Sequence, residues 1–408
     1  MILKENDIRI SLEEAQERLC RVIKPIERVE DLPILSCQGR RLAIDIVAHM
    51  DQPPFARSPL DGYAVRGIDT AGATKDKPIH LEVVEEVTAG DFSHRTLEAG
   101  QAIRIMTGAP IPKGANTVVM QEHTDYGEES VAIYQEVPPY KNYCHAGEDY
   151  KKGQVLIQAG IQLNAYHIGL LASLGMTHVT VKAKPKIAIL STGDELQRPG
   201  KALGQGQIYN SNQYTLAARL QQLECVPILL PATGDQVDVT ARTIRDALYQ
   251  VDLIITTGGV SVGKKDILHP VMDQLKAKRL FWKLDMKPGT PALASLVDDR
   301  LVLSLSGNPS AAAITFEVLF RPILERLNGE DSQGYISATA TLGQDFEKKS
   351  PTRRLLRGVY QGGQVYLPDR PVASGALGAM VTCNCLIDIP KGNKGLHKGE
   401  TVQIIQFC

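Results

Sequence analysis

Residues 252–268 read DLIITTGGVSVGKKDIL, and this stretch decides the fold and points to a function. An apolar run typical of a buried strand ends directly at Gly258 and Gly259. Glycines at a strand end let the backbone adopt positive φ and bring its N–H groups close to an anion. Gly263, two lysines and Asp266 follow, so an oxygen ligand stands beside the loop. The combination predicts a site for phosphate and a divalent cation, although glycine-rich strand ends also occur without a ligand.

The same strand-then-turn pattern repeats on both sides of this stretch, from about residue 186 to residue 327. Short apolar strands end in STGDEL (191–196), TGDQ (233–236) and SGNP (306–309), and a helical pattern follows each turn. Strands that alternate with helices imply a parallel sheet with right-handed crossovers. Ligands of such sheets bind at the carboxyl ends of the strands. The sequence therefore predicts a central three-layer α/β domain with glycine-containing turns gathered at one edge.

Capping residues place the elements of this domain. Asn212 is expected to cap a helix that ends near Leu223, and Asn308 with Pro309 is expected to start a long apolar helix. Further expected elements are strands at 187–190, 226–230 and 301–305 and a helix at 240–249.

The sequence patterns outside the α/β domain differ from region to region. Ser11 and Glu14 form a capping-box pattern ahead of an amphipathic helix, and a second helix is expected at 166–174. Short alternating runs broken by glycine and proline predict a small β domain. We expect four parts: a helical or extended linker domain (1–50 and 146–180), an inserted β domain (51–145), the α/β domain (181–330) and a C-terminal β-barrel (331–408).

Composition excludes several functional classes. The chain has 408 residues, enough for two to four domains. Its 45 basic and 46 acidic residues nearly cancel, so no global positive field attracts nucleic acid. No apolar run approaches the roughly 20 residues that span a bilayer, and the start, MILKENDIRISLEEA, lacks the apolar stretch of a signal peptide. We expect a cytoplasmic protein without nucleic-acid or membrane partners.

The cysteines do not indicate a metal site or a disulfide framework. Their number, seven, is odd, and no C-x-x-C pair occurs. We expect reduced residues that serve in packing. The positions are Cys20, Cys37, Cys144, Cys225, Cys383, Cys385 and Cys408.

Several motifs taken together resemble the molybdopterin molybdenumtransferase family (MoeA-type), to which the E domain of gephyrin is related. They are STGDEL, GQIYNSN (206–212), TTGGVSVGKKD (256–266), KLDMKPG (283–289) and SGNP, with PPFARSPLDGYAV (53–65) upstream. Their order and spacing match over essentially the whole chain. The resemblance implies molybdenum cofactor biosynthesis, in which molybdate is inserted into adenylylated molybdopterin with Mg²⁺-dependent release of AMP. It also implies an elongated homodimer, with an active site between one subunit's α/β domain and parts of the other, and allows contacts with other molybdenum cofactor biosynthesis proteins.

The resemblance also implies roles for single residues. It gives catalytic roles to Asp61, Glu195, Asp235 and Asp266, and makes the last three ligands of Mg²⁺, which prefers a few carboxylates with phosphates and waters. Simpler roles remain open, because Asp61 can serve as a turn former, Asn308 as a helix cap and Lys283 as an exposed strand lysine. The implied substrate-binding residues are Thr107, Asp149, Gly258, Gly259, Ser261, Gly263, Lys283, Lys287, Pro288, Pro291, Ser306 and Asn308.

Some positions depart from the family pattern. Cys144 stands where the family often has arginine, and Thr290 replaces the second lysine of KPGK. Gly378 and Ala379 replace a serine pair, and Thr382 replaces an arginine. These changes remove groups that would hold an anion but leave the carboxylates intact. The alternative function is therefore that of a diverged paralogue, acting as a related pterin-nucleotide-processing enzyme or as a non-catalytic scaffold.

Two smaller clusters carry hypotheses of their own. Cys144 beside His145 is a candidate nucleophile, but adjacent residues of a strand point opposite ways, which argues against it. Arg353, Arg354 and Arg357 lie close together in sequence. We expect them on a solvated strand, with anion binding only if the site is nearby.

Overall fold

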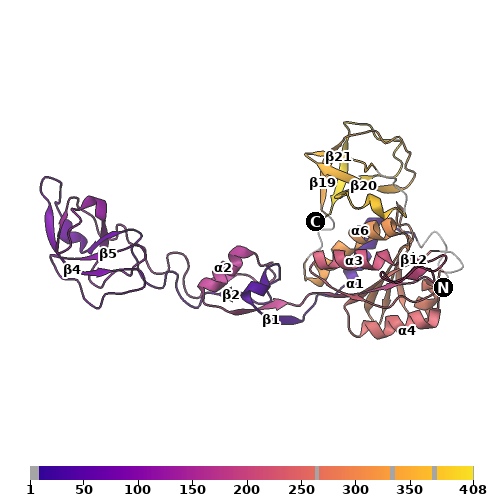
Figure 1. Cartoon of the computed structure of the whole chain (residues 1–408), viewed down its shortest axis with the longest axis horizontal. Helices are drawn as coiled ribbons and strands as arrows, with labels where there is room; N and C mark the ends of the chain where they lie inside the picture. The colour runs from indigo at the N-terminus through magenta and orange to yellow at the C-terminus, as the bar shows by residue number, and fades with distance from the viewer. Residues whose placement is uncertain (1–8, 262–265, 331–335, 370–374, 408) are drawn as a thin grey trace. The chain divides into compact units, whose positions relative to one another are not determined.

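The computed structural model describes residues 9–261, 266–330, 336–369 and 375–407 (Figure 1). The chain divides into two compact units. The first, here called the α/β–barrel unit, comprises residues 1–31, 39–41 and 180–408. The second, here called the N-terminal β unit, comprises residues 32–38 and 42–179.

A six-stranded sheet forms the centre of the α/β–barrel unit. Its order is β13-β10-β14-β18-β17-β15, with the first four strands parallel and the last two antiparallel. The parallel part confirms the prediction. The β17–β18 hairpin, which turns at Asp298 and Asp299 with positive φ, was not predicted. The strands are β10 (Lys186–Ser191), β13 (Val226–Leu229), β14 (Leu253–Thr257), β15 (Lys278–Trp282), β17 (Leu293–Val297) and β18 (Arg300–Leu305).

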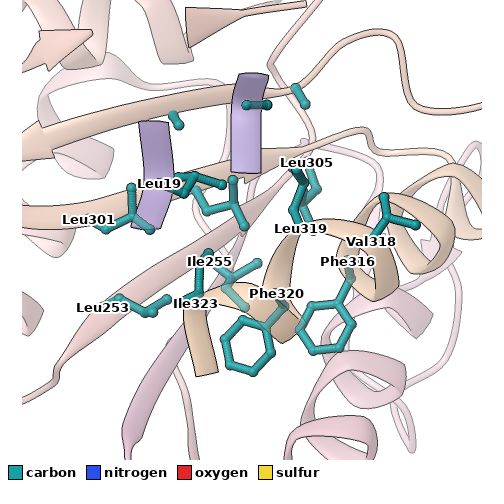
Figure 2. Packing of buried hydrophobic residues seen from close by; sticks show 14 of the residues in the cluster. Leu19, Leu253, Ile255, Leu301, Leu305, Phe316, Val318, Leu319, Phe320 and Ile323 are labelled. Atoms are coloured by element: carbon teal, nitrogen blue, oxygen red, sulfur yellow. The ribbon is translucent and has the colours of Figure 1, made fainter. Parts of the chain in front are cut away.

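Helices cover both faces of this sheet, which confirms the three layers. Ile187 and Ile189 of β10 belong to one buried cluster and Ala188 and Leu190 to the other, because successive strand residues face opposite sides. Figure 2 shows the first cluster, which includes the stacked rings of Phe316 and Phe320. The centroids of these two rings lie 4.7 Å apart. The first face carries α1 (Leu12–Val22), α3 (Ser211–Gln222) and α6 (Pro309–Leu327), and the second carries α4 (Val237–Leu248) and α5 (Leu268–Gln274).

Capping follows the sequence with one correction. Ser11 Oγ accepts a hydrogen bond from the Glu14 N–H at 3.1 Å, which is one of the two bonds of the predicted capping box, and the Glu14 carboxylate pairs with Arg18. The prediction that Asn212 caps α3 is wrong, because Asn210 takes this place and accepts from the Gln213 N–H. Asn212 instead donates to the Gly307 carbonyl at 2.8 Å, so its side chain ties α3 to the turn before α6.

Five strands near the C-terminus close into the predicted barrel. Their order is β20-β21-β19-β23-β22, and an additional β20–β22 pairing closes the sheet. Strand β16 (Met286–Lys287) comes from the α/β domain and pairs in parallel with β20. The barrel elements are β19 (Ser337–Leu342), β20 (Arg353–Gln361), β21 (Gln364–Tyr366), the 3₁₀ turn η5 (Leu377–Ala379), β22 (Cys385–Ile389) and β23 (Thr401–Gln406).

The N-terminal β unit contains the predicted small β domain as a five-stranded sheet of order β6-β3-β5-β4-β7. The helix α2 (Ala165–Ser173) is capped by Asn164, and Gly175 with φ 71° follows its end. The sheet strands are β3 (Gly62–Val65), β4 (Ile79–Val87), β5 (Gln101–Ile105), β6 (Thr117–Met120) and β7 (Ser130–Ile133). Smaller elements along the chain are β1 (Val29–Pro33), η2 (Ile34–Cys37), β2 (Ile46–Val47), η3 (Gly67–Thr70), η4 (Gln121–His123), β8 (Val155–Ile157), β9 (His178–Lys182), β11 (Leu196–Gln197) and β12 (Ile208–Tyr209).

The division into units differs from the predicted linker domain at the start of the chain. Helix α1 packs in the same buried cluster as β10 and α6, and residues 1–31 accordingly group with the α/β domain. The boundaries of the inserted β domain, the α/β domain and the C-terminal β-barrel stay predictions. None of the helices among the described residues is both long and apolar enough to cross a membrane.

Candidate functional site

The carboxyl ends of four neighbouring parallel strands meet at one edge of the central sheet. The helix that follows β10 lies on one face and the helix that follows β14 on the other. Adjacent strands with this property form a topological switch point, where open α/β sheets bind ligands. We call this region the carboxyl edge; it consists of residues 192–195, 230–235, 258–261 and 306–308, with Asp266.

Close backbone approach fixes the centre of the carboxyl edge. Gly258 has φ 93°, and a Cβ atom there would lie 2.4 Å from the Thr192 carbonyl oxygen. A Cβ on Gly259, which has φ 60°, would lie 3.0 Å from Thr192 Oγ1. That hydroxyl is buried and has no hydrogen-bond partner among the described residues. The two glycines thus form a tight cradle against Thr192, in which the Gly258 N–H donates to the Leu305 carbonyl at 3.2 Å.

The predicted acids stand around this cradle. Glu195 is exposed, and its carboxylate lies over Gly193. The Asp235 N–H donates to Asp194 Oδ1 at 3.1 Å, which ties the TGDQ turn to the STGDEL turn. A Cβ on Gly234 would lie 2.6 Å from the same oxygen, so a larger residue there would displace the Asp194 side chain.

Asp266 precedes α5 and is partly buried. Gly263 lies outside the described residues. Within the described ranges, no group of three or more His, Cys, Asp or Glu side chains is arranged to hold a metal ion. The Mg²⁺ site of Glu195, Asp235 and Asp266 therefore stays a prediction; its oxygen donors match the chemistry of Mg²⁺, and substrate phosphates would complete the ligand set.

The SGNP turn adds a helix N-terminus to the carboxyl edge. Asn308 is the N-cap of α6 through its backbone and makes no side-chain capping bond, so its exposed amide is available to a ligand. Ser306 is buried, and its Oγ accepts a hydrogen bond from the Asn308 N–H at 3.3 Å. The first amides of a helix attract anions.

A second feature, here called the cationic cavity, lies between the KPG loop, α6 and the barrel. Its volume is about 270 Å³, and it is lined by Lys287, Pro288, Ile314, Phe346, Lys348, Arg354, Leu355, Leu356 and Arg357. Four of these described lining residues are basic and none is acidic. A small space with this charge suits a tetrahedral dianion.

The buried arginine in this cavity is Arg357. It is only 3 % exposed, and its NH1 donates to the Ala376 carbonyl at 2.7 Å. Burial lowers the pKa of Arg357, although arginine stays protonated at neutral pH. The expectation of a solvated arginine strand is therefore wrong for this residue, because alternation along β20 places it on the same side as Leu355, which packs in the buried cluster of the α/β domain.

Asp61 and Thr107 meet in the N-terminal β unit. The Thr107 N–H and its Oγ1 both donate to Asp61 Oδ1 at 2.7 Å, because β3 and β5 pair directly beside them. These bonds lower the pKa of Asp61, the hydroxyl bond most. The expected D-G turn is a strand start instead: Gly62 begins β3, where a Cβ would lie 1.9 Å from the Val119 carbonyl oxygen.

Asp149 is the last residue of the GED motif (147–149) and is exposed in the same unit. Its N–H donates to the Gln52 carbonyl at 2.9 Å, just before the PPFARSPLDGYAV segment. The structure gives no contact between Asp149 and Asp61, so a shared role for them stays a prediction.

Comparison with known proteins identifies these features. Family models match three stretches: the MoeA N-terminal region (domain I and II) at 10–175, a probable molybdopterin binding domain at 188–326 and the MoeA C-terminal region (domain IV) at 339–407. A protein of Bacillus subtilis named molybdopterin molybdenumtransferase is 36% identical over 403 residues, covering 97% of this chain and 94% of that protein. The chain belongs to the molybdopterin molybdenumtransferase family.

Other members of this family agree with that assignment. A molybdopterin molybdenumtransferase of Staphylococcus epidermidis is 35% identical over 399 residues, covering 97% of this chain and 95% of that protein. The crystal structure of the molybdopterin biosynthesis MoeA protein from Pyrococcus horikoshii matches with a TM-score of 0.88 and 29% identity, covering 98% of this chain and 99% of that one.

Three departures from the family motifs, Thr290, Gly378 and Ala379, lie close to the cationic cavity, whereas Cys144 belongs to the N-terminal β unit. Thr290 Oγ1 donates to the Met286 carbonyl at 2.6 Å and closes the KPG loop. Gly378 and Ala379 form part of η5, next to the Ala376 carbonyl that accepts from Arg357. The cavity nevertheless retains its four basic residues.

Cys144 does not have the properties of an activated nucleophile. Its hydrogen bond with Glu148, together with partial burial, raises the pKa of the Cys144 thiol. A nucleophilic cysteine needs a lowered pKa, because the thiolate is the reactive form.

Two residues beside the predicted site were missed by the sequence analysis. These are His269 and Trp282, whose ring centroids lie 4.4 Å apart. Lys283 Nζ lies 4.2 Å from the centroid of the Trp282 ring. Burial, and then the charge of Arg279, lower the pKa of His269. The single tryptophan of the chain, directly before the KLDMKPG motif, is the signal that could have indicated this neighbourhood.

Proposed function

We propose that this chain inserts molybdate into adenylylated molybdopterin with Mg²⁺-dependent release of AMP. Its relatives carry the name molybdopterin molybdenumtransferase over nearly their full length. The observation that carries the proposal is the cationic cavity, in which Lys287 of the KPG motif stands with Arg354 and Arg357 and no described acid. Molybdate is a dianion that charged N–H donors bind well.

The carboxyl edge supports the nucleotide half of the proposal. The Gly259 N–H and the first amides of α6 are suited to orienting the phosphates of the adenylylated pterin. Glu195, Asp235 and Asp266 would hold Mg²⁺, which when bound polarises phosphate oxygens and neutralises developing charge. Buried strands β10 and β14 hold this geometry rigid before substrate arrives.

A direct assay tests the proposal. Purified protein is incubated with adenylylated molybdopterin, Mg²⁺ and molybdate, and AMP and active cofactor are measured together. We expect one AMP for each active cofactor, and no AMP release from Asp266→Ala at unchanged circular dichroism. Asp273→Ala is the matched control, since that carboxylate lies on α5 with its side chain 79% exposed. Full AMP release by Asp266→Ala would remove this residue from the site, and no release by the wild type would refute the function.

The family resemblance also leads us to propose a homodimer that works in the cytoplasm with other molybdenum cofactor biosynthesis proteins. Light scattering at micromolar concentration should give twice the mass of the 44.5 kDa chain. A fully active monomer would contradict the dimer without affecting the proposed reaction.

A further inference from the structure

The junction between the α/β domain and the barrel has two faces of different charge. Strand β20 points Arg353 and Arg354 to opposite sides, because side chains alternate along a strand. Arg354 lines the cationic cavity. Arg353 lines a separate cavity of about 400 Å³, whose lining also holds Glu13, Asp285, Asp388 and Lys391. We call the side of Arg353 the compensated face, because the lining of its cavity mixes acids and bases, whereas the described lining of the cationic cavity holds bases and no acid.

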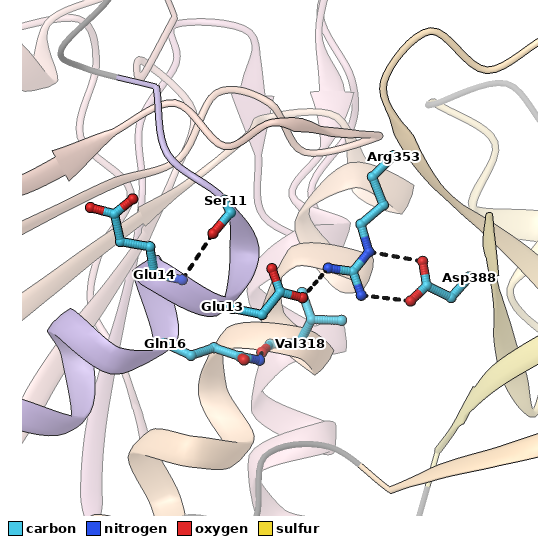
Figure 3. A network of polar contacts seen from close by, with 7 residues as sticks. All are labelled: Ser11, Glu13, Glu14, Gln16, Val318, Arg353 and Asp388. Carbon is cyan, nitrogen blue, oxygen red and sulfur yellow. Dashed lines mark hydrogen bonds and ion pairs between the residues drawn. The ribbon is translucent and has the colours of Figure 1, made fainter. Parts of the chain in front are cut away.

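Arg353 is the centre of the compensated face (Figure 3). Its Nε and NH2 donate to the two Asp388 carboxylate oxygens at 2.8 and 2.5 Å, and its NH1 donates to Glu13. Arg353 and Asp388 both belong to the barrel and are 17% and 15% exposed, whereas Glu13 lies on α1 and is 62% exposed. Arg353 therefore connects the barrel to a helix that packs in the α/β core.

A second ion pair crosses the same junction. Lys391 Nζ, from the barrel, donates to Asp285 Oδ2 at 2.9 Å. Arg9 lies 2.7 Å from the other oxygen of Asp285, and the Asp285 N–H donates to the Ile10 carbonyl. The hydrogen bond from Lys391 lowers the pKa of Asp285, which remains ionised at neutral pH. Asp285 immediately precedes β16, so this pair fixes the start of that strand.

Both ion pairs adjoin the residues that face the cationic cavity. In the β16–β20 register, Met286 is opposite Arg353 and Lys287 is opposite Arg354. Strand β16 has only two residues, so its backbone pairing alone provides few hydrogen bonds. Whatever holds β16 against β20 also sets the separation of Lys287 and Arg354.

We propose that Arg353, with Glu13 and Asp388, and the Asp285–Lys391 pair are positioning residues that align Lys287 and Arg354 on one oxyanion. The inference rests on the proposed function of the cationic cavity. Glu13 and Lys391 are 62% and 66% exposed, and ion pairs with such exposed partners add little to global stability. Small displacements of charged groups, in contrast, weaken binding and catalysis strongly. The expected effect therefore falls on the affinity of the cavity rather than on folding.

The test uses the full chain and sodium molybdate as the probe. In the double variant Glu13→Gln/Lys391→Gln, both bridges lose a charge while the Arg353–Asp388 fork stays intact. We expect the half-saturating molybdate concentration to rise about fivefold at constant ionic strength. Backbone amide exchange in residues 286–290 should accelerate at the same time, with an unchanged midpoint of thermal unfolding.

The matched control is Glu14→Gln/Lys394→Gln, because Glu14 pairs with Arg18 within α1 and does not reach the barrel. It should leave affinity and exchange as in the wild type. If Lys287→Gln does not weaken molybdate binding, the proposed function of the cavity fails first. If Lys287→Gln weakens binding but the double variant changes neither affinity nor exchange, the positioning role is refuted.

The single variant Glu13→Gln distinguishes a positioning effect from a general loss of structure. It should show part of the affinity loss at wild-type thermal stability. An affinity loss that occurs only in variants with lowered thermal stability would also overturn the positioning role.

Discussion

The carboxyl edge and the cationic cavity belong to the same unit, and in the proposed function they bind anions by different means. At the carboxyl edge, glycines bring backbone amides and one hydroxyl close together, and Gly258 sits where any Cβ would meet Thr192. In the cationic cavity, long charged side chains converge from segments far apart in sequence, such as Lys287 and Arg357. The first site depends on the exact course of the backbone, whereas the second depends on how a loop and a barrel are held together.

The largest effect is expected from a methyl group at the carboxyl edge. Gly258→Ala combines a positive φ with a Cβ 2.4 Å from the Thr192 carbonyl, so we expect a loss of about 2–4 kcal/mol in unfolding free energy. Gly200→Ala is the matched control, because Gly200 has φ 87° but no atom near its Cβ position. It should lose about 1 kcal/mol, from backbone strain alone. Equal losses in urea unfolding would show that the close approach at Gly258 is unimportant.

Removal of one cation from the cavity should act on ligand binding and leave stability intact. Lys287 is exposed, so Lys287→Gln should not change the midpoint of thermal unfolding. The loss of a charge-assisted hydrogen bond should raise the half-saturating molybdate concentration by about tenfold or more. Lys278→Gln, at an exposed position of β15, serves as the control. Equal affinity of the two variants would exclude Lys287 from the anion site.

A substitution that adds a positive charge tests the role of the KPG loop. Thr290→Lys restores the family lysine and should lower the half-saturating molybdate concentration about threefold through added charge. It also removes the hydrogen bond to the Met286 carbonyl, at a cost of about 1 kcal/mol in unfolding free energy. Thr290→Val removes the same bond without adding charge and should lose stability alone. Titration and urea unfolding of both variants separate the two effects, and no gain in affinity with lysine would place Thr290 away from the anion.

These two regions also differ in how far the sequence predicts them. The motifs at residues 191–196 and 256–261 contain their own glycines, so local rules place them at strand ends of a parallel sheet. Arg354 and Arg357 were expected on a solvated strand, because their environment depends on barrel closure between β20 and β22. The pairing of Arg353 with Glu13 joins residues that are 340 positions apart in sequence. No local pattern encodes such a contact.

Local patterns failed in two further places for identifiable reasons. The D-G pair at 61–62 has turn chemistry, but Gly62 is required by the close Val119 carbonyl of a neighbouring strand. Asn212 has the composition of a cap, but Asn210 is the residue whose side chain reaches the first turn of α3. Both errors arise because side-chain preference alone does not show which neighbour is closest.

The smallest effect concerns the carboxylate that Thr107 holds in the N-terminal β unit. The folded-state pKa of Asp61 is lowered, so its contribution to stability is present above its unfolded pKa of about 3.9 and is lost as pH falls through the folded value. Thr107→Val removes the hydroxyl bond and should raise the pKa of Asp61 part of the way, since the Thr107 N–H still donates. NMR titration of the Asp61 carboxyl carbon measures this. Thr88→Val, at another Thr–Asp contact, should leave the titration of Asp61 unchanged.

The central claim is that the oxyanion and the nucleotide phosphates occupy different regions, with the oxyanion in the cationic cavity. Anomalous diffraction from crystals soaked with tungstate, a heavy analogue of molybdate, tests it most directly. We predict an anomalous peak in the cavity, within hydrogen-bond reach of Lys287 and Arg354. A peak confined to the carboxyl edge near Gly258, with none in the cavity, would contradict the account.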